Sequence, residues 1–230
     1  YKRQVDTDIF YVIIILYIPI SERKNFHMQE YVMGNGAIAL GALAAGVNLV
    51  AGYPGTPSSE ILETISKYRH DGVYIEWSVN EKAAMEVAAA AAYSGARAMV
   101  TMKQVGLNVA ADPLMSLAYV GVKGGMVIVS ADDPGPISSQ TEQDTRRFAD
   151  FCRIPVFDPS SPEEAYKMIG EAFEYSEKYN TPVLFRPTTR VCHAYASIDN
   201  CDSPSPKKYE GFVKDSKKWV ILPSLSFANH

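Results

Sequence analysis

Short apolar segments alternate with amphipathic segments along most of the chain, and Gly and Pro separate them. Amphipathic stretches with apolar residues three and four positions apart are typical of helices, whereas short apolar runs are typical of buried strands. Alternating strands and helices form βαβ units, so we predict an α/β fold with three α/β/α layers around a mainly parallel sheet. The predicted strands cover residues 47–52, 73–77, 96–102, 125–131, 155–158 and 182–187.

The predicted helices carry start and stop signals. Helices are expected over residues 36–46, 58–68, 80–93 and 162–178, with a further helical stretch that opens at Gly106. Thr56 before Pro57 predicts an N-cap followed by proline at the first helical position. Ser161, with Glu164 three residues later, predicts a capping box. A long polar loop is expected over residues 132–147.

The two ends of the chain differ in character from its middle. Residues 1–27 contain a 12-residue apolar run at 9–20, which is shorter than the ~20 residues of a membrane-spanning helix. Acidic residues before this run, and polar, bulky residues after it, disfavour a signal peptide. We therefore predict an N-terminal extension over 1–27, one α/β domain over 28–198, and a linker over 199–230, where Asp, Ser, Pro and Lys accumulate.

Charge and cysteine content exclude several classes of protein. The chain has 22 Lys and Arg against 26 Asp and Glu, a net charge of −4, which argues against nucleic acid or an anionic membrane as partner. The three cysteines, Cys152, Cys192 and Cys201, are too few for a disulfide framework and lack zinc or iron–sulfur spacing. A reduced, cytoplasmic location is expected.

Candidate chemistry lies in the loops at the carboxyl ends of the predicted parallel strands, where such sheets bind ligands. No phosphate-binding glycine motif occurs in these loops. Glu81, in the first turn of an alanine-rich helix, either favours the helix dipole or relays a proton. Thr56 is either a plain helix cap or a cap that also faces a ligand. Asp132 and Asp133, followed by Pro-Gly-Pro, are more typical of a turn than of a metal site.

Several long motifs occur in a characteristic order: GNGAIALGALAAGV, GYPGTPSSEI, SVNEKAAMEVA, MKQVGLNVAADPLMSLAY, PVFDPSSPEEAYKM and PVLFRPTTRV. Through them the chain resembles the alpha subunit of indolepyruvate:ferredoxin oxidoreductases and, more loosely, the wider family of thiamine-diphosphate 2-oxoacid:ferredoxin oxidoreductases. The resemblance covers roughly residues 33–191 and is restricted to the pyrimidine-binding domain of that family. It implies oxidative decarboxylation of an arylpyruvate to an acyl-CoA, with ferredoxin as the electron acceptor.

The resemblance also implies roles for individual residues. Glu81 would hydrogen-bond the N1′ nitrogen of the aminopyrimidine and favour the tautomer that removes the thiazolium proton. The other implied cofactor contacts are Tyr53, Pro54 and Thr56 in the YPGTP loop, and Gln104, Gly106 and Asn108 near the thiazolium. No metal ligand is implied in this chain, because the diphosphate- and Mg²⁺-binding motif and the iron–sulfur cysteines of the family are absent from it.

Some positions depart from the family pattern. Other branches carry an Arg before a GPSTG-type loop that holds the substrate carboxylate, whereas this chain has ADDPGPISS. This departure favours the arylpyruvate branch and leaves the carboxylate partner open. Gly36 and Ile137 stand where the family pattern has Glu and His. The implied partners are the 2-oxo acid, CoA, ferredoxin, a beta subunit and a second alpha subunit.

Two other interpretations stay open at this point. One is a related 2-oxoacid:ferredoxin oxidoreductase subunit with a different keto-acid preference. The other is a fragment that folds and associates but does not catalyse. In each case the isolated chain is expected to be inactive.

Overall fold

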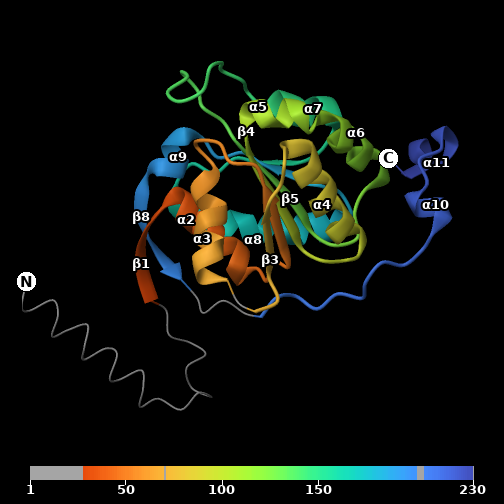
Figure 1. Ribbon diagram of the computed structural model, residues 1–230, viewed down its shortest axis with the longest axis horizontal. Coiled ribbons are helices and arrows are strands. Elements are labelled where there is room, and N and C mark those ends of the chain that lie inside the picture. The colour runs from red at the N-terminus through yellow and green to blue at the C-terminus, as the bar shows by residue number, and fades with distance from the viewer. Residues whose placement is uncertain (1–27, 70, 201–204, 230) are drawn as a thin grey trace, which may run out of the picture.

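The computed structural model describes residues 28–69, 71–200 and 205–229. A six-stranded, fully parallel sheet forms its centre, in the order β3-β2-β4-β5-β7-β6 (Figure 1). All six strands lie at or within two residues of the predicted ranges: β2 (Leu49–Gly52), β3 (Tyr74–Trp77), β4 (Ala98–Lys103), β5 (Met126–Ala131), β6 (Val156–Phe157) and β7 (Val183–Phe185).

Helices cover both faces of this sheet, which confirms the predicted three-layer α/β/α fold (Figure 1). One face packs against α2 (Gly34–Ala44), α3 (Ser59–Tyr68) and α8 (Pro162–Tyr179). The other packs against α4 (Glu81–Tyr93), α5 (Gln104–Val109), α6 (Ala111–Val120) and α7 (Arg146–Cys152).

Alternation along β4 shows how the central strands supply both cores. Met99 belongs to the core on the α2 side, whereas Val100 and Met102 belong to the core on the α4 side. Side chains in a strand alternate between faces, so an apolar run without polar interruption is what a sheet covered on both sides requires. The polar residue within the strand, Thr101, is buried, and the first charged residue is Lys103, where the strand ends and the next loop begins.

Several local features differ from the sequence-based prediction. Helix α3 begins at Ser59 after Ser58, so the predicted N-cap role of Thr56 is wrong; Thr56 lies in the preceding turn, with its side chain exposed. Of the predicted capping box of α8, the N-cap is confirmed, since Ser161 Oγ accepts a hydrogen bond of 3.2 Å from the Glu164 amide. The Glu164 side chain, however, accepts from the amide of Ser160, at 2.7 Å, and not from that of Ser161. The predicted long loop ends sooner than expected, because α7 begins at Arg146.

A small second sheet was not predicted. Strand β1 (Met28–Met33) pairs antiparallel with β8 (Tyr195–Asn200) beside α2, and α9 (Thr189–His193) leads into β8. The Tyr31 and Tyr195 rings stack with their centroids 5.6 Å apart. This sheet joins the two ends of the predicted 28–198 domain.

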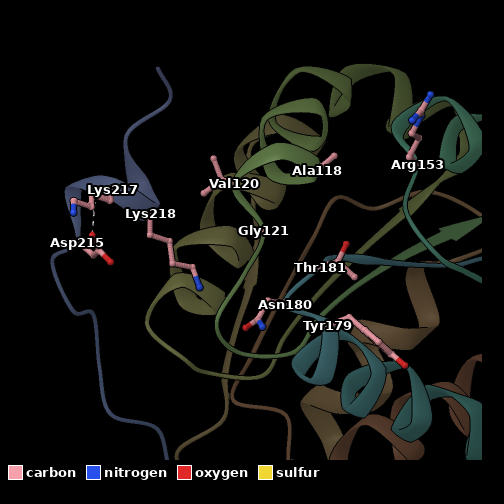
Figure 2. A pocket seen from close by; sticks show the side chains of 10 residues that line it. All are labelled: Ala118, Val120, Gly121, Arg153, Tyr179, Asn180, Thr181, Asp215, Lys217 and Lys218. Atoms are coloured by element: carbon pink, nitrogen blue, oxygen red, sulfur yellow. Dashed lines mark hydrogen bonds between the residues drawn. The ribbon is translucent and has the colours of Figure 1, made fainter. Parts of the chain in front are cut away.

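The C-terminal segment runs along the amino-end side of the main sheet. The Lys207 amide donates to the Gly46 carbonyl at 2.9 Å, and the Trp219 ring, at the end of α10 (Ser216–Trp219), lies 4.9 Å from the Tyr93 ring. A short helix, α11 (Pro223–Asn229), follows. A hollow of about 560 Å³ lies between α10 and the C-terminal ends of α6 and α8, and Figure 2 shows the residues that line it.

The domain boundaries stay predictions. The N-terminal extension 1–27, with its apolar run, and Cys201 lie outside the described residues. Among the helices that the structure describes, none combines the length and the apolar character needed to cross a bilayer.

Candidate functional site

The predicted functional loops meet at one edge of the sheet. In a parallel sheet all carboxyl ends lie together, and the loops after β2, β3, β4 and β5 leave from that edge. The hollow in Figure 2 is lined by residues that precede strands, such as Gly121 and Thr181, and therefore lies at the opposite edge. The carboxyl edge holds the predicted site residues.

Glu81 is held at this edge by the start of α4. The Asn80 side chain caps the helix by accepting a hydrogen bond of 2.8 Å from the Ala83 amide, which fixes Glu81 as the first helical residue. Glu81 is only 9% exposed. Within the part of the chain that the structure describes, its carboxylate has no hydrogen-bond or ion-pair partner. A nearly buried carboxylate without a partner is unusual for a residue with a purely structural role.

Gly106 is the residue on which the Glu81 side chain rests. A Cβ at position 106 would lie 2.5 Å from Glu81 Oε1, 2.7 Å from its Cγ and 2.9 Å from its Cδ. Any larger residue would therefore displace the carboxylate. Two residues that are 25 positions apart, both predicted to belong to the site, are thus in direct contact.

Gln104 begins α5 beside this contact and is fully buried. Its Nε2 donates to the Thr141 carbonyl at 3.1 Å, which ties the helix to the loop after β5. Its Oε1 is buried and has no partner among the described residues. The edge therefore presents two unsatisfied acceptors, the Glu81 carboxylate and the Gln104 carbonyl oxygen.

The backbone of the YPGTP loop is anchored by hydrogen bonds to side chains of α2 and α3, and most of its own side chains are exposed. Asn35 Nδ2, buried at the start of α2, donates to the Pro57 carbonyl at 2.6 Å, and the Gly55 amide donates to Ser59 Oγ at 2.8 Å. The predicted contact residues Tyr53, Pro54 and Thr56 are exposed. A fixed backbone thus presents free side chains at the edge.

Asn108 is separate from this group. It lies on the exposed side of α5, whereas Gln104, Gly106 and Leu107 of the same helix are buried. It forms no hydrogen bond with another predicted site residue within the described ranges.

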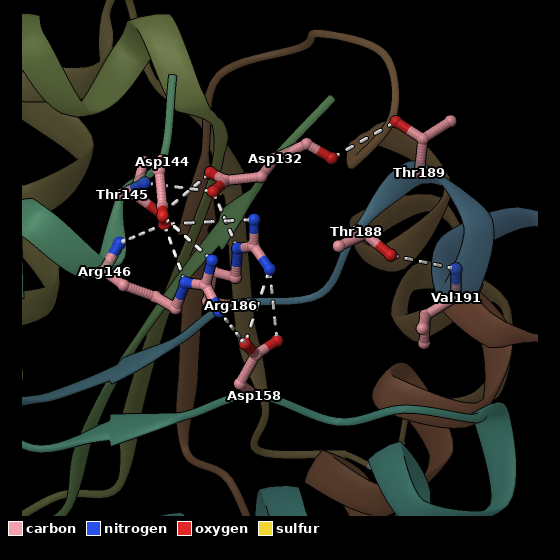
Figure 3. A network of polar contacts seen from close by, with 9 residues as sticks. All are labelled: Asp132, Asp144, Thr145, Arg146, Asp158, Arg186, Thr188, Thr189 and Val191. Carbon is pink, nitrogen blue, oxygen red and sulfur yellow. Dashed lines mark hydrogen bonds and ion pairs between the residues drawn. The ribbon is translucent and has the colours of Figure 1, made fainter. Parts of the chain in front are cut away.

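The loop after β5 begins with a buried ion pair, which Figure 3 shows. Asp132 is fully buried and accepts from Arg186 Nε at 2.7 Å, from the Thr145 hydroxyl at 2.7 Å and from the Thr145 amide at 3.0 Å. Burial raises the pKa of Asp132, and the hydrogen bonds from Arg186 and Thr145 act against that rise. Arg186 also pairs with Asp158 at 3.4 Å, so the ends of β5, β6 and β7 are linked.

Asp133 organises the turn itself. Its Oδ2 accepts from the amides of residues 137, 138 and 139, at 2.8 to 3.0 Å, and its Oδ1 accepts from the Thr189 hydroxyl at 2.7 Å. Burial alone would raise the pKa of Asp133, but these hydrogen bonds outweigh it and lower the pKa to about 2. The two acids thus form a turn, the interpretation that the sequence favoured. The described ranges hold no group of three or more His, Cys, Asp or Glu residues suited to a metal.

Sequence reasoning missed three residues of this edge. Asn35, in the GNG motif, anchors the YPGTP loop, and Arg186, in PVLFRP, neutralises Asp132. Lys103 ends β4, and its aliphatic stem lies against Gly55. For Arg186 and Lys103, the available sequence signal was a charged residue directly at the end of an apolar strand.

A family model described as "Pyruvate flavodoxin/ferredoxin oxidoreductase, thiamine diP-bdg" matches residues 40–217. The chain belongs to this family. It is 50% identical over 198 residues to the indolepyruvate oxidoreductase subunit IorA of Thermococcus kodakarensis, which covers 84% of this chain and 31% of the relative. The corresponding subunit of Pyrococcus horikoshii is 46% identical over 204 residues, which cover 86% of this chain and 32% of that subunit.

More distant relatives have a different named substrate. The 2-oxoglutarate synthase subunit KorA of Methanocaldococcus jannaschii is 29% identical over 79% of this chain and 52% of the relative. A solved 2-oxoglutarate:ferredoxin oxidoreductase from Magnetococcus marinus matches with a TM-score of 0.68 at 18% identity, over 79% of this chain and 34% of that one. This structural match supports the fold. The chain spans about one third of the length of the indolepyruvate oxidoreductase subunits that it matches.

Proposed function

We propose that this chain is the aminopyrimidine-binding part of a thiamine-diphosphate enzyme that oxidatively decarboxylates arylpyruvates, indolepyruvate among them, to aryl-acetyl-CoA with ferredoxin as acceptor. The observation that carries the proposal is the Glu81 carboxylate, nearly buried, unpaired and seated on Gly106. It is supported by membership in a thiamine-diphosphate-binding family. The 46–50% identity to indolepyruvate oxidoreductase subunits, against 28–29% to 2-oxoglutarate synthases, favours the arylpyruvate over other 2-oxo acids.

The polar groups at the carboxyl edge of the sheet fit an aminopyrimidine. Such a ring carries a nitrogen that can share a proton with a carboxyl group. It also carries an amino group that donates hydrogen bonds. Glu81 supplies the carboxyl group, and the buried Oε1 of Gln104 supplies an unpaired acceptor. Tyr53, Pro54 and Thr56 would contact the cofactor or substrate from the YPGTP loop, and Gly106 and Asn108 would line the wall.

In the proposed mechanism, Glu81 holds and returns one proton at the ring nitrogen. When bound, thiamine diphosphate supplies the carbon nucleophile and the electron sink for decarboxylation. Because the Glu81 side chain rests on Gly106, its carboxyl group keeps one orientation toward that nitrogen. The buried Gln104 and the anchored YPGTP loop would orient the reactants and exclude water.

Other groups of the complete enzyme are proposed to lie outside this chain. These are the diphosphate- and Mg²⁺-binding residues, the iron–sulfur clusters, and the contacts with CoA, ferredoxin, a beta subunit and a second alpha subunit. We expect a cytoplasmic enzyme. On its own the chain offers stacking and one or two hydrogen bonds to charged groups, worth roughly 1–3 kcal/mol. Calorimetry of the 230-residue chain with thiamine diphosphate and Mg²⁺ should therefore show millimolar binding at best.

The test uses a chimaeric subunit in which residues 28–217 of this chain replace the matching segment of the Thermococcus kodakarensis subunit, assembled with the companion subunits of that enzyme. Glu81→Gln keeps the shape but removes the proton, and turnover should fall about 10²- to 10⁴-fold while cofactor content is retained. Glu86→Gln, on the exposed side of the same helix, is the matched control and should retain full turnover. Equal turnover in both variants would exclude Glu81 from catalysis.

A further inference from the structure

The site described above lacks a partner for the carboxylate of the substrate. A 2-oxo acid carries that carboxylate next to its keto carbon, and proteins bind carboxylates with Arg or Lys through charge-assisted hydrogen bonds. Two cationic residues stand directly at strand ends on the carboxyl edge: Lys103, the last residue of β4, and Arg186, which follows β7. Arg186 is already engaged by Asp132 and Asp158.

Lys103 is placed between the YPGTP loop and the wall that begins with Gln104. A Cβ on Gly55 would lie 3.1 Å from Lys103 Cδ and 3.2 Å from its Cγ, so the lysine stem runs along the YPGTP loop. The next residue along the chain is Gln104, which begins the wall beside Glu81. The side chain is partly exposed, which leaves its end accessible to a ligand.

No acid neutralises this lysine within the described part of the chain. Its Nζ forms no ion pair or hydrogen bond there. The nearest acids in the sheet order follow β5, whose Ala131 is paired with Lys103. Asp132 is engaged by Arg186 and Thr145, and Asp133 by the turn amides and Thr189. With these two acids engaged elsewhere, the Lys103 ammonium group stays available for an external anion.

We propose that Lys103 binds the carboxylate of the 2-oxo acid substrate. This inference rests on the proposed function, because it assigns a residue to the substrate of that same site. The stem, packed along Gly55, limits where the ammonium can reach. Lys103 is thereby a determinant of substrate binding.

The experiment compares Lys103→Met and Lys103→Arg in the chimaeric enzyme, with Lys82→Met as the control. Lys82 is an exposed lysine on α4 that pairs with Asp112 at 2.8 Å. Loss of one charge-assisted hydrogen bond should raise KM for indolepyruvate about 10- to 100-fold in Lys103→Met, with a smaller effect on kcat. Lys103→Arg should recover most of the loss, and Lys82→Met should match the parent.

Two inhibitors separate charge recognition from general damage. Inhibition by indole-3-acetate, which carries a carboxylate, should weaken by the same factor in Lys103→Met, whereas inhibition by the neutral indole-3-acetamide should stay unchanged. An active parent whose Lys103→Met variant keeps KM and both inhibition constants within twofold would overturn the lysine assignment and leave the proposed function intact. A folded, cofactor-loaded parent without arylpyruvate oxidation would overturn the proposed function itself.

Discussion

The contact between Glu81 and Gly106 makes a measurable prediction for the 230-residue chain. In Gly106→Ala, the new Cβ would lie 2.5 Å from Glu81 Oε1 and within 2.9 Å of two side-chain carbons. Replacing Gly by Ala inside a helix normally stabilises by about 0.5–1 kcal/mol. Overpacking a tight contact costs about 1–3 kcal/mol. Gly106→Ala should therefore lower the free energy of unfolding by roughly 0.5–2 kcal/mol.

A double-mutant cycle isolates the cause. Because the clash is with the Glu81 side chain, Gly106→Ala made in a Glu81→Ala background should stabilise rather than destabilise. The coupling energy between the two positions should be about 1–3 kcal/mol. Gly36→Ala is the matched control, since a Cβ there meets only Val32 Cβ at 3.5 Å. Because that is an ordinary contact distance, Gly36→Ala should show only the stabilisation expected from replacing glycine by alanine in a helix.

The assay is urea unfolding of each variant, followed by circular dichroism. If Gly106→Ala changes stability equally with and without Glu81, or stabilises as much as Gly36→Ala does, then the glutamate does not rest on this glycine. The proposed positioning of the Glu81 carboxyl group by Gly106 would then be refuted.

Two further predictions concern the acids that follow β5. Asp133 has its pKa lowered to about 2, so the stability it provides is present above the ordinary Asp pKa and is lost as pH falls toward 2. The gap in unfolding free energy between the wild type and Asp133→Asn should therefore narrow by about 1 kcal/mol between pH 5 and pH 3, and a constant gap would contradict it. Arg186→Met should cost about 3–5 kcal/mol because it leaves Asp132 buried without its cation. Adding Asp132→Asn should recover part of that loss, and a cost below 1 kcal/mol in the single variant would show that the pair is not needed.

The layered fold could be predicted because each element carries its own signal. The short apolar run at β5, bounded by Gly125 and Asp132, is typical of a strand covered on both faces, and the structure buries every position of it. Ser161 and Glu164 indicate the start of α8, because a serine side chain can cap a helix by accepting from the amide three residues later. Strands β1 and β8 gave no such signal, because they pair across more than 160 residues and β8 is half exposed. Their pairing depends on tertiary contacts that no local pattern encodes.

The sequence could name candidate site residues but not the contacts between them. Glu81 and Gly106 could be named from motif and residue type, yet the seating of one on the other depends on how α4 and α5 pack. Thr56 was misassigned as a cap because Ser and Thr before a proline fit that role locally, whereas the turn places α3 three residues further on. Lys103 was passed over because a single charge at the end of a strand is common in any sheet.

The turn held by Asp132 and Asp133 has a consequence for how the sequence of this domain can vary. Asp133 binds the amides of residues 137, 138 and 139 in the first half of the loop, and Asp132 binds the Thr145 amide at its end. These contacts use backbone groups, so the exposed side chains of residues 134–138 can change while the turn and the strands beneath it keep their geometry. Side-chain libraries at these positions, with the loop length kept constant, are a direct route to altered ligand selectivity on an unchanged scaffold.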